Sequence, residues 1–296
     1  MNLSRSSVLA TALVITVAGC RTGLPATPFA TPAPFPVDSV RSQRVVDGVS
    51  HYVVRSPTGP WTINVLDVDL DRCNVAEAVK GADSANGRFK VTQLLAELAT
   101  REPVVAGVNG DFFVLKTGAP TNLLVVNGRM IAPPNGKPVL AFDSAGVPHI
   151  TTFTLSPDGR LAPFFPLNAV GGRGVLVRNG AITSDVDTEG GAGFRERNPR
   201  TAAGIARNGH RLILVAVDGR EYQNAGMTLR ELGDLMVALG ARDALNLDGG
   251  GSTTMVYTDP DSAGRLRIAN HPSDKEGERT VGDALAIVHA CGRASR

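Results

Sequence analysis

Short apolar runs separated by turn signals constrain the fold of this chain more than any other feature. Six stretches between residues 44 and 217 have the length and composition of strands: RVVDGVSHYVV, WTINVLDVDL, NLLVVNGRMI, PVLAFDSAGVPHI, GVLVRNGAI and AAGIARNGHRLILVAV. Several contain an Asp-Gly or Asn-Gly pair, which suits a two-residue hairpin turn because both residues tolerate positive φ. The pattern predicts a series of β-hairpins.

Two other stretches show helical periodicity. They are VTQLLAELATR at residues 91–101 and TLRELGDLMVALGA at residues 228–241. The second opens with a capping box formed by Thr228 and Glu231, and its leucines fall on one face. Runs of strands with a few interspersed helices favour the α+β class. We therefore expect a single domain over residues 40–296, built on a largely antiparallel or mixed β-sheet with a few amphipathic helices.

The N-terminal stretch MNLSRSSVLATALVITVAGC has the features of an export signal. One positive charge precedes an apolar run over residues 8–18, which is shorter than the ~20 residues of a membrane span. We expect a signal peptide over residues 1–19, and residues 17–20 resemble the bacterial lipoprotein cleavage motif. Lipidation of Cys20 would then make the chain an exported cell-envelope lipoprotein, anchored to a bacterial membrane by lipid alone. A plain signal peptide with a chance cysteine is the alternative.

The segment after this signal is proline-rich. Residues 20–39 lack periodic hydrophobicity and are predicted to form an extended tether. Without Cys20, the chain has two cysteines, Cys73 and Cys291. An even pair in an exported protein predicts a disulfide, and two buried free thiols are the alternative.

Composition excludes one class of partner. The chain is 43% hydrophobic and 20% charged, as in ordinary globular proteins, and its formal net charge is +2. Its lysines and arginines are scattered and its aromatic content is 5%, so it lacks the basic, aromatic-studded stripe of a nucleic-acid binder. We expect no nucleic-acid partner.

The stretch DALNLDGGGSTTMVYT at residues 243–258 places three glycines between two predicted strands. Glycine loses the most chain entropy on folding, so a triplet requires close backbone approach or positive φ. A tight hairpin turn and a flexible linker are the plain alternatives, and the flanking strands argue against the linker. The triplet lacks the lysine of a phosphate-binding loop and the spacing of a nucleophile elbow, and the five histidines lack zinc-site spacing.

Acidic, amide and arginine side chains gather in four stretches: GVNGDFF (107–113), RNPRTAAGI (197–205), NLDGGGSTT (246–254) and NHPSDKEGERTVGDA (270–284). Together with LILVAVDGR and the second predicted helix, and in this order, they resemble the phosphodiester glycosidase family. The similarity runs from about Val104 to Val288. It implies hydrolysis of sugar-1-phosphodiesters at the glycosidic carbon, for example N-acetylglucosamine-1-phosphodiester-like groups on envelope or extracellular glycans.

Two residues depart from the family pattern. Where the resemblance leads us to expect proline and asparagine, this chain has Thr280 and Asp283. Asp283 is therefore a weaker site candidate than Glu278 or Arg279.

The chemistry of glycosyl phosphate cleavage fits these residue types. An oxocarbenium-like transition state calls for a carboxylate as nucleophile, base or electrostatic stabiliser, usually one of a pair. Asp248 and Glu278 are the leading candidates, and Asp111 is the third. The phosphate leaving group is already anionic, so it needs charge neutralisation, which the arginine fork provides. Arg200 and Arg279 are the candidates for that role.

The glycine triplet completes the predicted binding site. Backbone N–H groups at glycines can approach phosphate or sugar hydroxyls closely, as in anion-binding nests. The predicted substrate-binding residues beside the arginines are Asn109, Thr201, Gly249, Gly250, Gly251, Ser252 and Thr253.

Plainer roles stay open for several of these residues. Asp248 can bond its own turn, Arg200 can form a structural ion pair, and Glu278 can be a solvated loop charge. Asn109 and Asp111 can be turn residues. Phe112 and Phe113 are expected in the core rather than in a sugar platform.

Two other functions also stay open. In a metal-dependent phosphodiesterase, a divalent cation held by Asp111, Asp248 and Glu278 would direct water to phosphorus. A surface lipoprotein could instead bind glycan without turnover. The sequence establishes no cofactor, and a divalent cation stays an open alternative.

Overall fold

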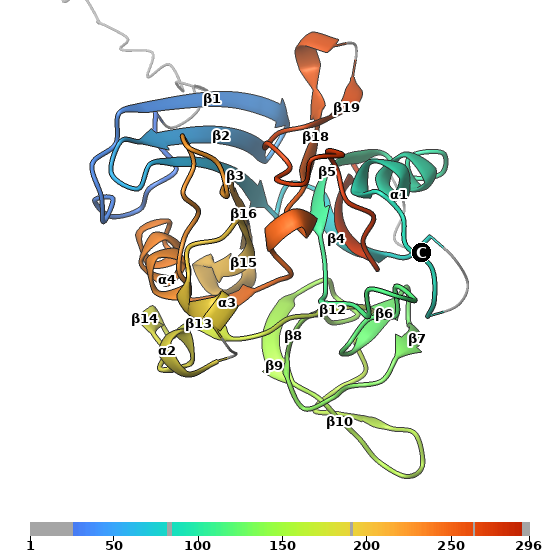
Figure 1. Cartoon of the computed structure of the whole chain (residues 1–296). Helices are drawn as coiled ribbons and strands as arrows, with labels where there is room; N and C mark the ends of the chain where they lie inside the picture. The colour runs from blue at the N-terminus through green and yellow to red at the C-terminus, as the bar shows by residue number, and fades with distance from the viewer. Residues whose placement is uncertain (1–25, 82–84, 190–191, 263, 292–296) are drawn as a thin grey trace, which may run out of the picture.

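The computed structural model describes residues 26–81, 85–189, 192–262 and 264–291 (Figure 1). Strands dominate these residues, and every pairing among the described strands is antiparallel.

Three sheets carry most of these strands. The eight-stranded sheet has the order β1 (Ser39–Val46), β2 (Val49–Ser56), β3 (Trp61–Asp69), β16 (Arg211–Val217), β15 (Arg200–Ala206), β17 (Asp243–Asn246), β13 (Val175–Arg178) and β14 (Ala181–Ile182). One five-stranded sheet has the order β19 (Arg265–Ile268), β18 (Met255–Asp259), β5 (Val104–Asn109), β20 (Ala284–His289) and β4 (Asn74–Val79). The other has the order β7 (Arg129–Ala132), β6 (Leu124–Val126), β12 (Asn168–Gly171), β8 (Pro138–Phe142) and β9 (Pro148–Thr152), and a two-stranded ribbon joins β10 (Thr154–Leu155) to β11 (Leu161–Ala162).

The predicted hairpins are confirmed. β1 pairs with β2, β6 with β7, β8 with β9, β13 with β14, and β15 with β16. Asn127 and Gly128 turn β6 into β7 with φ of 47° and 76°, which is the left-handed geometry that Asn-Gly pairs favour.

The predicted α+β class is wrong, because the fold is mostly β. Helix α1 (Val91–Leu98) and helix α4 (Leu229–Ala238) form where predicted, whereas α2 (Asp185–Thr188) and α3 (Ala192–Arg195) are single turns. The capping box of α4 is present, since the N–H of Glu231 donates to Thr228 Oγ1 at 3.2 Å. Helical periodicity identified both longer helices, but each covers only one face of one sheet, and hairpins make up the rest.

The buried faces of the sheets meet in one hydrophobic core. Val49 and Leu66 of the eight-stranded sheet, Val108 of one five-stranded sheet and Leu140 of the other belong to the same cluster. Helix α4 packs on the opposite face of the eight-stranded sheet, and α1 packs on the sheet that contains β5 (Figure 1). The ends of β5 and β17 therefore lie where the sheets come together.

The described part of the predicted tether lies against the sheets. The N–H groups of Ala30 and Thr31 donate to the carbonyl of Ala238 at 2.8 and 3.2 Å, and the ring of Phe35 is 5.0 Å from that of Trp61. The predicted signal peptide and Cys20 lie outside the described residues. No helix in the described ranges is both long and apolar enough to span a membrane.

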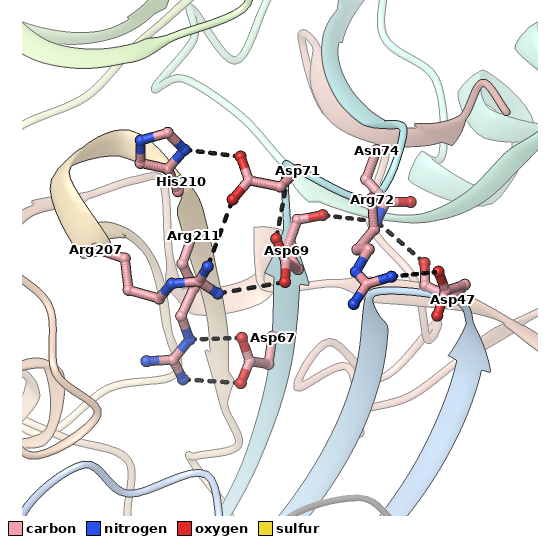
Figure 2. Close-up of polar contacts among 9 residues, drawn as sticks. All are labelled: Asp47, Asp67, Asp69, Asp71, Arg72, Asn74, Arg207, His210 and Arg211. Carbon is pink, nitrogen blue, oxygen red and sulfur yellow. Dashed lines mark hydrogen bonds and ion pairs between the residues drawn. The ribbon is translucent and has the colours of Figure 1, made fainter. Parts of the chain in front are cut away.

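Cys73 and Cys291 form the predicted disulfide, with their Cα atoms 5.1 Å apart. The ends of β3 and β16, with the loops beside them, carry a network of ion pairs (Figure 2). Arg211 donates to both oxygens of Asp67 at 2.6 and 2.8 Å, Arg207 lies 3.3 Å from Asp69, and other residues extend the network. The carboxylates of this surface thus face cationic side chains.

Candidate functional site

Asn109, the last residue of β5, connects three of the segments that the sequence singled out. Its side-chain N–H donates to the carbonyl of Asp248 at 2.7 Å, and its Oδ1 accepts bonds from Thr201 Oγ1 at 2.8 Å and from the Thr254 N–H at 3.1 Å. Asn109 and Thr201 are fully buried. They hold the Asp248 loop against the ends of β5 and β15.

The glycine triplet crosses from one sheet to another. β17, before it, pairs with β15, whereas β18, after it, pairs with β5 in a different sheet. The triplet is therefore neither a hairpin turn nor a linker. Gly250 has φ of +61°, and its N–H donates to the carbonyl of Pro199 at 2.8 Å as the chain enters a 3₁₀ turn over Gly250–Ser252.

Protein side chains occupy the space beside these glycines. A Cβ on Gly250 would lie 2.9 Å from Nη2 of Arg220, and one on Gly251 would overlap Asp274 and Arg279. Close approach does explain the glycines, but the groups that approach in this structure are arginine and aspartate side chains.

Asp248 follows β17 at the start of the triplet. Its Oδ1 accepts the N–H of Gly249 at 2.9 Å. Burial raises the pKa of Asp248 to about 6, against the opposing effects of Ser252, the Gly249 N–H and the charge of Arg279. A carboxyl group with a pKa near neutrality suits a nucleophile or general base.

Two further carboxyl groups are connected to Asp248 through Gly110. The N–H of Asp248 donates to the Gly110 carbonyl, the Gly110 N–H donates to the Asp283 carbonyl, and both distances are 3.1 Å. The N–H of Asp111 donates to Asp283 Oδ1 at 2.9 Å. Asp111 is 2% exposed and Asp283 is fully buried. The structure thus brings Asp111 and Asp248 together and adds Asp283, which the sequence analysis had ranked low.

The pKa values of Asp111 and Asp283 are both raised above the usual value of a carboxyl group. Burial, and then the charge of Asp283, raise the pKa of Asp111 well above its usual value. Burial raises the pKa of Asp283 to about 7, although the Asp111 N–H and the charge of Lys80 oppose this rise. At neutral pH the cluster can therefore contain both an ionised and a protonated carboxyl group.

Glu278 is bonded elsewhere. Its two oxygens accept the N–H of Thr92 at 2.9 Å and the hydroxyl of Thr92 at 2.6 Å. Thr92 lies in the first turn of α1, where a carboxylate stabilises the exposed N–H groups and the helix dipole. These contacts give Glu278 a structural role in this arrangement.

The two predicted arginines are held by protein groups. Arg279 makes a two-pronged contact with Asp274, at 2.7 and 2.9 Å. Arg200 is 5% exposed and donates to the carbonyls of Met227 and Glu196, both at 2.8 Å. Burial lowers the pKa of Arg200 to about 10, and the neighbouring charge of Arg220 adds to this effect.

Arg220 is a residue that the sequence analysis missed. It is exposed, has φ of +62°, and its Nε donates to Asn198 Oδ1 at 3.1 Å. Its guanidinium lies over Gly250, next to the Asp248 loop. Its position in LILVAVDGR, directly after a predicted strand and within the stretches that carry the resemblance, was the available signal.

Two cavities flank this region. One, of about 630 Å³, is lined by Asp218, Asn270 and His271 among others, and Asn270 also donates to the Thr253 carbonyl at 3.0 Å. The other, of about 320 Å³, is lined by residues that include Phe112 and Arg173.

Phe112 and Phe113 differ in their surroundings. Both residues line the smaller cavity, but Phe113 packs in the core as expected, whereas Phe112 is half-buried. Within the described ranges, no cluster of three or more His, Cys, Asp or Glu side chains has an arrangement that could hold a metal ion.

Known proteins share both the sequence and the fold. A sequence model of the family described as phosphodiester glycosidase matches residues 102–288. The N-acetylglucosamine-1-phosphodiester alpha-N-acetylglucosaminidases of Mus musculus and Bos taurus are 33% and 32% identical over 178 and 180 residues. Each match covers 56% of this chain, and 33% and 32% of the two relatives. The chain thus spans about a third of the length of the curated relatives it matches.

Solved structures show the same fold. The catalytic domain of the zebrafish N-acetylglucosamine-1-phosphodiester alpha-N-acetylglucosaminidase, auto-inhibited by its pro-peptide, superposes with a TM-score of 0.61 at 17% identity, covering 89% of this chain and 97% of that domain. A hypothetical protein from Synechocystis gives a TM-score of 0.64 at 16% identity, covering 87% of this chain and 64% of the other. On the evidence of the family match, which extends over more than half of its length, the chain belongs to the phosphodiester glycosidase family.

Proposed function

We propose that this chain hydrolyses the glycosidic bond of sugar-1-phosphodiesters, such as N-acetylglucosamine-1-phosphodiester-like groups on envelope or extracellular glycans. The observation that carries the proposal is the cluster of Asp248, Asp111 and Asp283, bonded through Gly110 and located inside the region that matches the family. Paired carboxyl groups with separated pKa values are what glycosidic bond cleavage uses.

Asp248 has the strongest claim to contact the reacting carbon. It lies beside a glycine turn, and its pKa of about 6 leaves it mostly ionised at neutral pH. As the bond between the anomeric carbon and the phosphate oxygen breaks, its electron pair leaves with the phosphate. The carboxylate of Asp248 would stabilise the positive charge that develops on the sugar, either by attacking the carbon or by activating water.

Arg220 is the best-placed cation for the departing phosphate. Its guanidinium is exposed beside Gly250, whereas Arg200 donates to backbone carbonyls and Arg279 is paired with Asp274. We assign phosphate neutralisation to Arg220 and loop positioning to Arg200. Arg279 would contribute if substrate displaced Asp274.

Export is part of the same proposal. The disulfide between Cys73 and Cys291 supports an oxidising compartment, because such bonds persist mainly outside the cytoplasm. The predicted signal peptide and the predicted lipidation of Cys20 would then place the enzyme on the outer side of a bacterial membrane.

Product analysis tests the reaction. The full chain is incubated with a panel of sugar-1-phosphodiesters, with and without a chelator. Free reducing sugar plus a phosphomonoester on the other partner is the expected result, and it should disappear in Asp248→Asn. Asp243→Asn, at the start of β17, the strand that precedes Asp248, is the matched control.

Other products would reject the proposal. Sugar phosphate that disappears with chelator would indicate attack at phosphorus. Saturable binding of the diester without any product would indicate a glycan-binding protein.

A further inference from the structure

Asp111 and Asp283 each have one oxygen that is bonded and one that is not. Asp111 Oδ2 accepts the N–H of Asn122 at 2.8 Å, and Asp283 Oδ1 accepts the N–H of Asp111 at 2.9 Å. Asp111 Oδ1 and Asp283 Oδ2 are buried and have no hydrogen-bond partner among the described residues. Because a buried oxygen without a donor is destabilising, two of them in adjacent side chains call for an explanation.

Tight packing surrounds both carboxyl groups. A Cβ on Gly110 would overlap Asp283 Oδ1, and a Cβ on Gly171 would lie 2.7 Å from Asp111 Oδ2. Glycine backbone therefore lies directly against each group. The two carboxyl groups have little room to separate or to turn toward solvent.

Few charges face the pair. Lys80, directly after β4, is the cation that acts on Asp283. Its ammonium donates to the backbone carbonyls of Gly87, Gly118 and Gly282. Asp248, from the end of β17, adds a further negative charge. By contrast, Asp67 in the surface network receives both prongs of an arginine (Figure 2).

Two ionised carboxylates in this position would repel one another strongly, since burial removes the screening that water provides. A hydroxyl on one of them would remove that repulsion. It would also supply the donor that the other lacks, so that a single O–H···O bond satisfies both free oxygens.

We propose that Asp111 and Asp283 hold one proton between them, carried on Asp283 Oδ2 and donated to Asp111 Oδ1, which makes Asp283 a positioning residue for the reaction. The proton comes from solvent, and no other bond forms or breaks. The elevated pKa values of both groups agree with this arrangement. The shared proton is independent of the proposed function, and only its effect on turnover rests on that function.

The arrangement predicts how activity varies with pH. Asp248 must be ionised to act, so activity rises through its pKa of about 6. The pKa values of both Asp111 and Asp283 are raised, that of Asp283 to about 7, so the pair loses its last proton only on the alkaline side of neutrality. The pair then carries two negative charges and Asp111 loses its orienting bond, so we expect kcat/KM to rise through about pH 6 and to decline again at alkaline pH.

Infrared difference spectroscopy tests the proton without relying on turnover. Spectra of the full chain and of Asp283→Asn are compared at about pH 7, where the pair should still hold its shared proton. We expect the C=O band of a protonated carboxyl group in the wild type to be missing from the variant. Asp259→Asn is the control, because Ser262 and other donors hold the pKa of Asp259 at about 2, so this change should remove no protonated band. Equal protonated bands in the wild type and Asp283→Asn would overturn the proposal.

Turnover tests the positioning role. Asp283→Ala removes the donor, and misplacing a reacting group by about 1 Å can lower kcat roughly 10²-fold. Asp283→Asn supplies an N–H donor that does not titrate, so it should recover activity relative to Asp283→Ala and abolish the alkaline decline. An active wild type whose alkaline decline persists unchanged in Asp283→Asn would refute the positioning role. An inactive wild type that retains the infrared band would refute the proposed function and leave the shared proton established.

Discussion

Asp248→Asn should make the protein more stable at neutral pH while removing its activity. Asparagine has nearly the same size and can still accept the N–H of Gly249, so the turn is preserved. The change removes a charge that the folded state buries. Activity and stability should therefore move in opposite directions, which a purely structural role for this side chain does not predict.

The size of the stability change follows from the pKa of Asp248. Burial raises that pKa from 3.8 to about 6, and a difference of one pKa unit corresponds to about 1.4 kcal/mol. The folded state binds the proton more tightly than the unfolded state does. Stability is thus fully present below about pH 4 and declines as the pH rises through about 6. At pH 7 the variant should be more stable by up to roughly 3 kcal/mol, and at pH 4 it should match the wild type.

Thermal unfolding at about pH 4 and pH 7, measured on the samples used for turnover, checks this prediction. At roughly 2–4 °C per kcal/mol, the expected gain in Tm at pH 7 is on the order of 5–10 °C. Loss of kcat should reach roughly 10²-fold, the usual size of an electrostatic catalytic contribution. Asp243→Asn is the control, because it removes an ion pair with Arg178 and should not raise the Tm. A lower Tm at pH 7 in Asp248→Asn, or the same change at both pH values, would refute the reasoning.

Two further predictions concern the surroundings of Asp248. Gly250→Ala should destabilise the fold by about 1 kcal/mol or more, because φ is +61° and the new methyl group meets Arg220; in urea unfolding it should cost more than Gly128→Ala, which has φ of +76° in open space. Arg220→Lys should lower kcat/KM by an amount equivalent to about 1–3 kcal/mol with little change in Tm, whereas Arg200→Lys should chiefly lower the Tm, because it loses bonds to backbone carbonyls. The opposite assignment of kinetic and thermal effects to the two arginines would contradict the roles given to them.

Local features of the sequence predicted local structure well. Asn-Gly pairs located the hairpins, and the Thr228 capping box located α4, because both signals act within a few residues. The class of the fold was missed, since the way hairpins merge into three sheets depends on pairings between strands distant in sequence. β15 and β17 illustrate this, because they pair although they are about forty residues apart in the sequence.

The candidate site shows the same difference between what local sequence signals predict and what depends on distant contacts. Asn109, Asp111 and Asp248 lie in segments with unusual composition, and the structure brings those segments into contact. Asp283 was ranked low because it departs from the family pattern, and its burial cannot be read from neighbouring residues. Glu278 has the right charge but bonds to Thr92, a partner 186 residues away.

The supporting partners of the carboxylates distinguish the candidate site from the surface. Asp67 and Asp69 have arginine partners, so their negative charge is balanced (Figure 2). Asp283 is fully buried and Asp248 is half-buried, and Oδ1 of each accepts a backbone N–H.

Burying carboxylates in this way lowers stability at neutral pH, because the folded state resists their ionisation. Such a cost persists where the reaction requires it, since a carboxyl group already neutralised by arginine could neither stabilise a developing positive charge nor exchange a proton near pH 7. The charge of Arg279 acts on Asp248, but Arg279 is paired with Asp274, and among the described residues no cation forms a direct ion pair with Asp248. This property suits Asp248 to catalysis, and it is also why its replacement by asparagine should stabilise the fold.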